Sequence, residues 1–221
     1  MNDIFREIHF KLLQNQATLA DALEALKEAL SASHQLTPNW HALGFIHCKL
    51  FESEAGTLRL HIWPPNERSP LEQKSKIHDH IFDLKSLVLC GQITNVLHTE
   101  SDRIETPSKA FELHYVEYNR QGSRLIASGK EVFAAEKIRS EIKKGNTYQI
   151  QKGMLHDSQV SIDELTATIV ATYGHVQERP RMLGTPGETP PKKRELVAFP
   201  TIDWENLIQK VIDELRKESG A

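Results

Sequence analysis

Residues 43–63 read LGFIHCKLFESEAGTLRLHIW, and this stretch decides the fold. Apolar side chains occupy every second position on both sides of a Glu54-Ala55-Gly56 turn. Successive side chains of a strand point to opposite faces of a sheet, so this period of two predicts two strands joined as a β-hairpin. The apolar face carries Ile46, Cys48 and Leu50 on the first strand and Leu58, Leu60 and Ile62 on the second.

More short strands are predicted after the hairpin, separated by turns that contain Gly, Asn or Asp. No helical pattern interrupts them, which favours antiparallel pairing in a sandwich or barrel. The fold class is therefore expected to be mainly β. The predicted strands cover residues 81–90, 92–98, 111–119, 124–127, 131–142, 147–151 and 166–173.

Helices are predicted at both ends of the chain. Residues 3–33 carry apolar stripes at spacings of three and four, in two pieces. Thr18, three residues before Asp21, resembles a capping box that opens the second piece. After Tyr173 the chain is loop-like and rich in Pro until a last amphipathic helix opens at Asp203.

The length of 221 residues fits one domain. We expect a helical segment (1–40) packed on a barrel (41–178), followed by a Pro-rich strap and a C-terminal helix (179–221). Residues 179–200 either cover the mouth of a pocket or only tie down the last helix, and the sequence does not decide between these.

Charge and composition exclude several classes of partner. The net charge of -3 is the opposite of the basic footprint that nucleic acid requires. No apolar run reaches the ~18 residues of a membrane helix, and the first residues do not resemble a secretion signal. We therefore expect a cytoplasmic protein with no nucleic-acid or membrane partner. Only Cys48 and Cys90 are present, with no CxxC, so neither a zinc finger nor a disulfide framework is expected.

The histidines are the informative feature. His78-Asp79-His80 is expected at the start of a strand, where residues i and i+2 share a face and can hold one metal together. A third ligand has to come from elsewhere, and His156 follows the Gly145 and Gly153 turns. Three histidines from two remote segments therefore form a candidate metal site.

These residues resemble the two motifs of the cupin superfamily, over about residues 43–175. The first motif reads HxH, three or four residues, Glu, six residues, Gly; His78, His80 and Gly91 match it. The second reads Gly, five residues, Pro, one residue, Gly, two residues, His; it is matched by Gly145, Gly153 and His156, with Gln151 at the Pro position. The resemblance implies a cupin-type antiparallel β-barrel, also called a double-stranded β-helix or jelly roll.

The glutamate of the first motif is missing, because its position, with six residues between it and Gly91, is occupied by Leu84. One interpretation is that the metal site has decayed and the protein is a non-enzymatic cupin that binds a small molecule. The other is a three-histidine site. Three neutral imidazoles leave the full charge of a divalent ion, which favours an anionic ligand such as a thiolate.

A closer resemblance is to the cysteine dioxygenase type of thiol dioxygenase. It rests on the HxH pair after Ile77, on Tyr148 eight residues before His156, on Tyr173 seventeen residues after it, and on leucine-rich helices ahead of the barrel. This resemblance implies Fe(II) held by the three histidines, a small thiol and O2 as substrates, and a sulfinate as product. It also implies that Tyr173 acts as a catalytic hydrogen-bond donor and that Tyr148 lies at the substrate.

The resemblance places the carboxylate-binding arginine of that family on the first strand of the hairpin, where the best register gives His47. Arg59 on the next strand shares its face and can substitute, so we predict both as substrate-binding residues. His47 and His61 lie opposite each other across the hairpin, either as pocket walls or, as the alternation favours, on the solvent side.

Phe82, Leu84 and Ile169 are expected to form an apolar wall beside the metal. The same ligands also suit zinc or nickel, and a zinc-bound water has a pKa near ~7 and is a hydrolytic nucleophile. The sequence leaves open the substrate, the native metal and the oligomeric state.

Overall fold

The computed structural model describes residues 2–67, 76–101, 108–119, 122–187 and 194–217. Its helices are α1 (Asn2–Leu13), α2 (Leu19–Ser31) and α3 (Thr201–Arg216), with a 3-10 turn at Ser33–Gln35. Its strands are β1 (Asn39–Trp40), β2 (Ile46–Ser53), β3 (Gly56–Trp63), β4 (Asp83–Cys90), β5 (Gln92–Ser101), β6 (Lys109–Asn119), β7 (Gly122–Lys143), β8 (Thr147–Ile150), β9 (His156–Gln159), β10 (Thr166–Tyr173), β11 (Arg181–Gly184), β12 (Arg194–Glu195) and β13 (Val197–Ala198).

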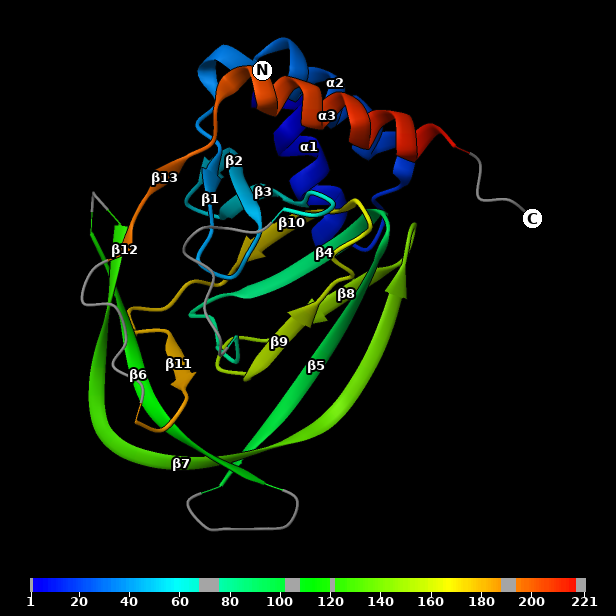
Figure 1. Cartoon of the computed structure of the whole chain (residues 1–221). Helices are drawn as coiled ribbons and strands as arrows, with labels where there is room; N and C mark the ends of the chain where they lie inside the picture. The colour runs from blue at the N-terminus through cyan, green and yellow to red at the C-terminus, as the bar shows by residue number, and fades with distance from the viewer. Residues whose placement is uncertain (1, 68–75, 102–107, 120–121, 188–193, 218–221) are drawn as a thin grey trace.

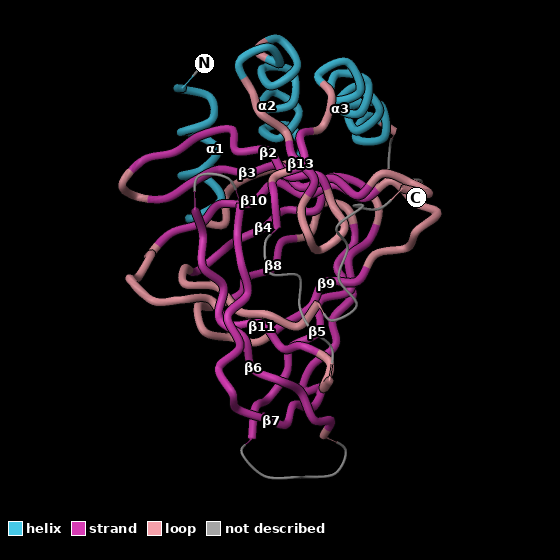
Figure 2. Tube along the Cα trace, turned by 60° about the vertical axis from the view of Figure 1, so that its left-hand side comes forward, coloured by secondary structure: helices cyan, strands magenta, loops and turns pink. Residues whose placement is uncertain are grey.

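The strands form two sheets whose pairs are all antiparallel. The first has the order β13-β1-β2-β3-β10-β4-β8, and the second has the order β11-β6-β7-β5-β9, with β12 paired to β7. The three helices lie together at one end, against the first sheet, while β5, β6 and β7 reach away from them (Figures 1 and 2). This confirms the predicted mainly β class with flanking helices, and the curled sheets are consistent with a cupin-type jelly roll.

The alternation of the hairpin explains why the first sheet has two different faces. Ile46, Leu58 and Leu60 belong to a large apolar cluster with Leu26 of α2 and Trp204 of α3. The apolar face predicted from residues 43–63 is therefore the face that the helices cover. The opposite face of the sheet points into the barrel.

The inner faces of the two sheets pack on each other. Phe45 and Trp63 at the hairpin contact a cluster with Val88 of β4, Ile93 of β5 and Ile142 of β7. Residues from both sheets thus close the same interior, as a barrel requires.

Two lysines of the barrel connect it to the ends of helices. Lys85 Nζ of β4 donates a hydrogen bond to the carbonyl of Leu13 at the end of α1 (2.6 Å). Lys144 Nζ, just after β7, donates to the carbonyls of Glu214, Leu215 and Lys217 at the end of α3 (2.8, 3.0 and 2.7 Å). The last carbonyls of a helix lack partners within the helix, so these cations hold α1 and α3 on the sheet.

The helix start at Thr18 is as predicted. The Thr18 hydroxyl accepts a hydrogen bond from the Asp21 amide (3.2 Å), and the Asp21 carboxylate accepts one from the Thr18 amide (2.8 Å). This reciprocal pair is the capping box expected from the sequence. The last helix begins at Thr201, two residues before the predicted start.

Several predicted boundaries are wrong. Residues 124–127 and 131–142 are parts of one strand, β7. Residues 181–184, expected in a loop, form β11 and pair with β6, so the start of the strap belongs to the second sheet. The rest of the strap includes 188–193, which lie outside the described residues. No helix in the described part of the chain is long and apolar enough to cross a membrane.

Candidate metal centre

The three predicted ligands lie together, on segments that differ from the prediction. His78 forms isolated bridges with His156 of β9 and with Met182 of β11, and the regular strand begins only at Asp83. The backbone amides and carbonyls of His78 and His156 bond reciprocally at 2.9 and 2.8 Å. The carbonyl of His80 accepts a bond from the Gly153 amide (2.9 Å). Backbone hydrogen bonds therefore join the segment that carries His78 and His80 directly to the segment that carries His156.

The imidazoles converge. One ring nitrogen from each of His78, His80 and His156 lies within 4.8 Å of the others. The Nε2 atoms of His80 and His156 are 3.0 Å apart. Two nitrogens bound at right angles to one metal, with bonds of ~2.1 Å, lie ~3.0 Å apart, so the spacing fits a shared ion.

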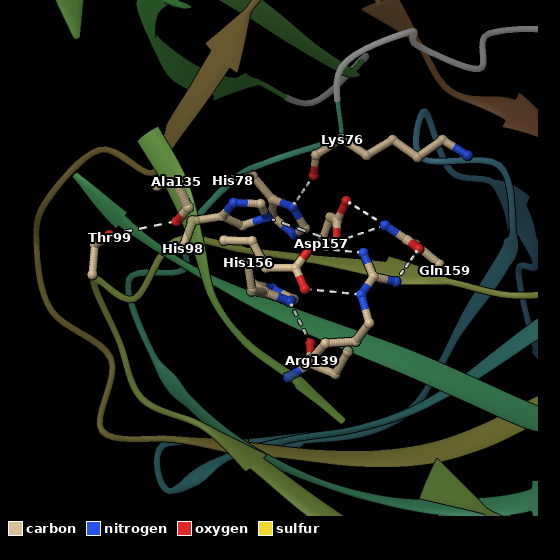
Figure 3. A network of polar contacts seen from close by, with 11 residues as sticks. Lys76, His78, His98, Thr99, Ala135, Arg139, His156, Asp157 and Gln159 are labelled. Carbon is tan, nitrogen blue, oxygen red and sulfur yellow. Dashed lines mark hydrogen bonds and ion pairs between the residues drawn. The ribbon is translucent and has the colours of Figure 1, made fainter. Parts of the chain in front are cut away.

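Two of the rings form a hydrogen bond on the side opposite the candidate metal position, and this bond determines which ring nitrogen faces the metal. His78 Nδ1 lies 2.8 Å from the carbonyl of Lys76, and His156 Nδ1 lies 3.2 Å from Asn95 Oδ1 (Figure 3 draws the first). Both partners are oxygen acceptors, so each Nδ1 carries the proton and each Nε2 keeps its lone pair. This is the tautomer that a metal-binding histidine with an outer hydrogen bond adopts.

Burial keeps these rings neutral. Desolvation is the main cause that lowers the pKa of His78, and it lowers those of His80 and His156 well below the usual range. His78 also lowers the pKa values of His80 and His156, and His80 lowers that of His156, since a second positive charge nearby is unfavourable. Neutral imidazole is the form that binds a metal ion.

No carboxylate joins the three rings among the described residues. Asp79 points away and accepts hydrogen bonds from Arg181. Asp157 accepts a bond from Gln159 (3.1 Å) and lies 3.8 Å from His98 Nε2, as Figure 3 shows. Leu84, at the position of the missing glutamate, is buried in an apolar cluster with Ile150. The candidate site is therefore a three-histidine site.

One of the three candidate ligands, His80, contacts both an aromatic ring and a cavity. Phe82 stacks on His80, with ring centroids 4.8 Å apart and planes at 19°. His80 also borders a cavity of ≈ 440 Å³, lined in addition by Asp79, Tyr115, Arg179 and Arg181. His80 is thus the one of the three candidate ligands among the residues that line this cavity.

The polar face of the hairpin lies inside the barrel, so the expectation that His47 and His61 face solvent is wrong. Their rings are 5.5 Å apart, and Phe45 packs on His61 at 4.6 Å. Burial lowers the pKa of His47 to about 3 and that of His61 well below its usual value. The helices cover the apolar face of the hairpin, and its polar face therefore points into the barrel.

Arg59 and Tyr148 share this interior. The guanidinium carbon of Arg59 lies 5.0 Å from the centre of the Phe82 ring, and Arg59 Nε donates to Thr57 Oγ1 (2.8 Å). Burial is the main cause that lowers the pKa of Arg59. Tyr148 packs against Phe82 and Leu84 in one apolar cluster, and burial raises its pKa. The predicted substrate-binding residues therefore line the same inner face.

Tyr173 and Ile169 are not brought to the three rings. Ile169 and Ala171 belong to the cluster that faces the helices, and Val170 packs inside. By strand alternation Tyr173 shares the helix side, where its hydroxyl accepts a hydrogen bond from Gln149 (3.1 Å). The predicted catalytic tyrosine and the predicted wall residue Ile169 are therefore on the wrong face.

The sequence did not point to Asn95, Arg181 or His175. Asn95 is buried on β5, and His175 packs on Phe82 at 4.8 Å. None of these belongs to a motif. The one available signal for Asn95 is an isolated polar residue between the apolar Ile93 and Leu97 on the inner face of a strand.

Comparisons with known proteins give only remote matches. No protein-family model matches the sequence. No curated protein matches it either. Among solved structures, a cupin domain of Drosophila melanogaster CENP-C is 15% identical and has a TM-score of 0.35, over 62% of this chain and 74% of that one.

Two further solved structures are similarly remote. A hydroquinone 1,2-dioxygenase from Sphingomonas sp. TTNP3 with bound 4-hydroxybenzoate is 11% identical (TM-score 0.34; 66% of this chain, 73% of that one). CapF with an inhibitor is 15% identical (TM-score 0.37; 62% and 30%). At this level the matches assign neither a family nor an activity. The structure itself shows the two antiparallel sheets of the barrel and a group of three histidines that can hold one metal ion.

Proposed function

We propose that this protein is a mononuclear non-haem iron dioxygenase that oxidises a small thiol to a sulfinate with O2. The observation that carries the proposal is the convergence of His78, His80 and His156 within 4.8 Å, with no carboxylate beside them in the described residues. A ligand set of three neutral groups leaves the charge of the ion uncompensated. A substrate that binds as an anion supplies that compensation.

A thiol fits this requirement. Coordination to a divalent cation deprotonates a thiol, and the thiolate is the nucleophilic form of sulfur. Iron, when bound, supplies the redox chemistry that brings the thiolate and O2 together. The reaction RSH + O2 → RSO2H balances with no other reductant, since sulfur loses the four electrons that O2 accepts.

The interior also favours a substrate with a second anionic group. Among the described residues no carboxylate lies within ion-pair distance of Arg59, and His47 and His61 beside it are neutral. An anionic group of the thiol would therefore meet the guanidinium of Arg59 on this inner face. We assign Arg59 and His47 to substrate binding on this basis, with Tyr148 forming part of the wall.

Apolar side chains exclude water from the reacting groups. Phe82 covers His80, and Leu84, Ile150 and Val170 form the buried cluster next to it. Without water beside these apolar side chains, the electrostatic interaction between Arg59 and an anion is stronger. The apolar side chains also hold the substrate in a fixed orientation.

The test combines metal analysis with oxygen consumption. The protein is loaded anaerobically with Fe(II), Zn(II) or Ni(II), and O2 uptake is recorded with cysteine, 3-mercaptopropionate, cysteamine and larger thiols. We expect uptake with Fe(II) and at least one thiol, and one sulfinate per O2 by mass spectrometry. His80→Ala is expected to lose bound metal and activity. His34→Ala, at an exposed histidine far from the triad in sequence, is the matched control and keeps both.

Two results would contradict the proposal. If the iron-loaded protein consumes no O2 with any thiol of the panel, the thiol reaction is wrong. If the protein prefers zinc or nickel and shows no iron-dependent uptake, the site belongs to another kind of metalloprotein.

A further inference from the structure

The ligand segment 78–80 lacks the support of a regular strand. His78 has only isolated bridges, and Asp79 and His80 lie outside the strands. The short turn before His156 contains Gly153 and is equally irregular. Among the described residues, only three backbone hydrogen bonds join the two ligand segments directly, two between His78 and His156 and one from the Gly153 amide to the His80 carbonyl, so side-chain contacts add to a short and irregular set.

Arg181 of β11 makes several of these contacts. Its amide and its Nε donate to the two carboxylate oxygens of Asp79, both at 2.6 Å. Its Nη2 donates to the carbonyl of Gly153 (3.0 Å), and its Nη1 donates to Glu100 at the end of β5 (2.6 Å). The guanidinium of Arg181 thus connects Asp79, which lies between His78 and His80, with the turn that precedes His156 and with strand β5 of the second sheet.

The burial of Asp79 makes this arrangement specific. Asp79 is 5% exposed, so its charge has little water around it and depends on Arg181. The planar guanidinium has enough donors in fixed directions to serve all three partners at once, which the single ammonium of lysine lacks. The carboxylate of Asp79 points away from the metal-binding nitrogens, so the pair acts on the position of the ligands and not as a ligand.

We infer that Arg181, through Asp79 and Gly153, is a positioning residue that sets the spacing between the ligand segments, and that metal affinity and coordination geometry depend on it. The inference rests on the metal-binding part of the proposed function and not on the thiol reaction. Outer contacts that orient metal ligands typically change metal affinity ~10- to ~100-fold when removed.

The test compares Arg181→Gln, Arg181→Lys and the double variant Asp79→Asn/Arg181→Gln with the wild type. Arg179→Gln is the matched control, because Arg179 lines the same cavity but pairs with Glu117 (2.8 Å) and touches neither ligand segment in the described contacts. Affinities for Fe(II), Co(II) and Zn(II) are measured by competition with a chelating indicator. The visible spectrum of the Co(II) form reports the coordination geometry, and the melting temperature of the metal-free protein reports folding.

We expect Arg181→Gln to weaken metal binding ~10- to ~100-fold and to change the Co(II) spectrum. The metal affinity of Arg181→Lys is expected to lie between those of Arg181→Gln and the wild type. Arg179→Gln is expected to have the metal affinity and the Co(II) spectrum of the wild type. The double variant removes the buried charge together with its partner, so it remains informative if Arg181→Gln fails to fold, and it is also expected to bind metal weakly.

The outcomes separate the two proposals. Wild-type affinity and an unchanged Co(II) spectrum in both Arg181→Gln and the double variant would overturn the role of Arg181. A wild-type protein that binds none of these metals overturns the metal centre and the role of Arg181 with it. Weakened binding in the variants together with an absence of O2 uptake by the wild type supports the role of Arg181 and contradicts only the thiol reaction.

Discussion

The imidazole of His47 lies inside the barrel, and its burial has a consequence for stability in acid. Its pKa falls from 6.5 to about 3 on folding. Between these values the unfolded chain binds a proton that the folded chain does not, so the free energy of unfolding decreases as the pH falls below 6.5. From pH 7.5 to 5 this one group is expected to remove about 2 kcal/mol.

Replacing His47 by Asn tests this expectation. The free energy of unfolding of the variant, measured by urea denaturation at several pH values, should decrease less steeply between pH 7.5 and 5 than that of the wild type. His34→Asn is the control, because His34 is exposed and its substitution should leave the slope unchanged. Equal slopes for His47→Asn and the wild type would mean that His47 is protonated, and therefore hydrated, in the folded protein.

At the level of single residues the sequence indicated which histidines come together at one site, but not which groups orient their rings. Histidine is chemically distinctive, and among the 11 histidines His78, His80 and His156 stood out by their spacing. Their outer partners are a backbone carbonyl and Asn95, which carry no such signal. The side of Tyr173 was also not visible, because strand alternation shows which residues share a face and leaves open which face is inner.

At the level of the elements, the end of α3 gives a second prediction. Lys144 Nζ donates to the carbonyls of Glu214 and Leu215 in the last turn of this helix and to that of Lys217 directly after it. A cation at these carbonyls is favourable both as a hydrogen-bond donor and through the helix dipole. Lys144→Met is therefore expected to lower the free energy of unfolding by about 1 to 2 kcal/mol.

The measurement is chemical denaturation at neutral pH, with Lys210→Met as control. Lys210 lies on the exposed side of the same helix, so Lys210→Met should lower the free energy of unfolding by well under about 1 kcal/mol. If the two variants are equally stable, the contacts of Lys144 do not hold α3 on the barrel.

The elements themselves were predicted where the apolar pattern was local. Strand β10 agrees with the predicted 166–173, because its run of buried residues is uninterrupted. Strand β7 was divided because Ser128, Gly129 and Lys130 are typical of a turn. The pairing with β6 shifts register at these residues, between Ala127 and Glu131, and then continues, so they form an irregularity inside one strand. Strand β11 lies among Pro and Gly residues, and only its pairing with β6 and its contact with His78 make it a strand.

The whole molecule brings together histidines that are about 76 residues apart in the sequence, and only the closed barrel does so. The unfolded chain has no such site. An ion that binds the folded state alone stabilises it by an amount that grows with the logarithm of its concentration, about 2.7 kcal/mol at 100 times the dissociation constant. The metal should therefore behave as a cross-link between residues 78–80 and 156 that exists only in the folded protein.

We expect Fe(II) or Co(II), added anaerobically at this excess, to raise the melting temperature of the wild type by roughly 5 to 10 °C, since about 1 kcal/mol corresponds to ~2 to ~4 °C for a domain of this size. A chelator should reverse the increase. His80→Ala should show no increase, while His34→Ala should behave like the wild type. An equal increase in His80→Ala would mean that the ion binds elsewhere on the protein. An unchanged melting temperature in a wild type that demonstrably binds the ion would contradict this expectation, because it would mean that the unfolded chain binds the ion equally well.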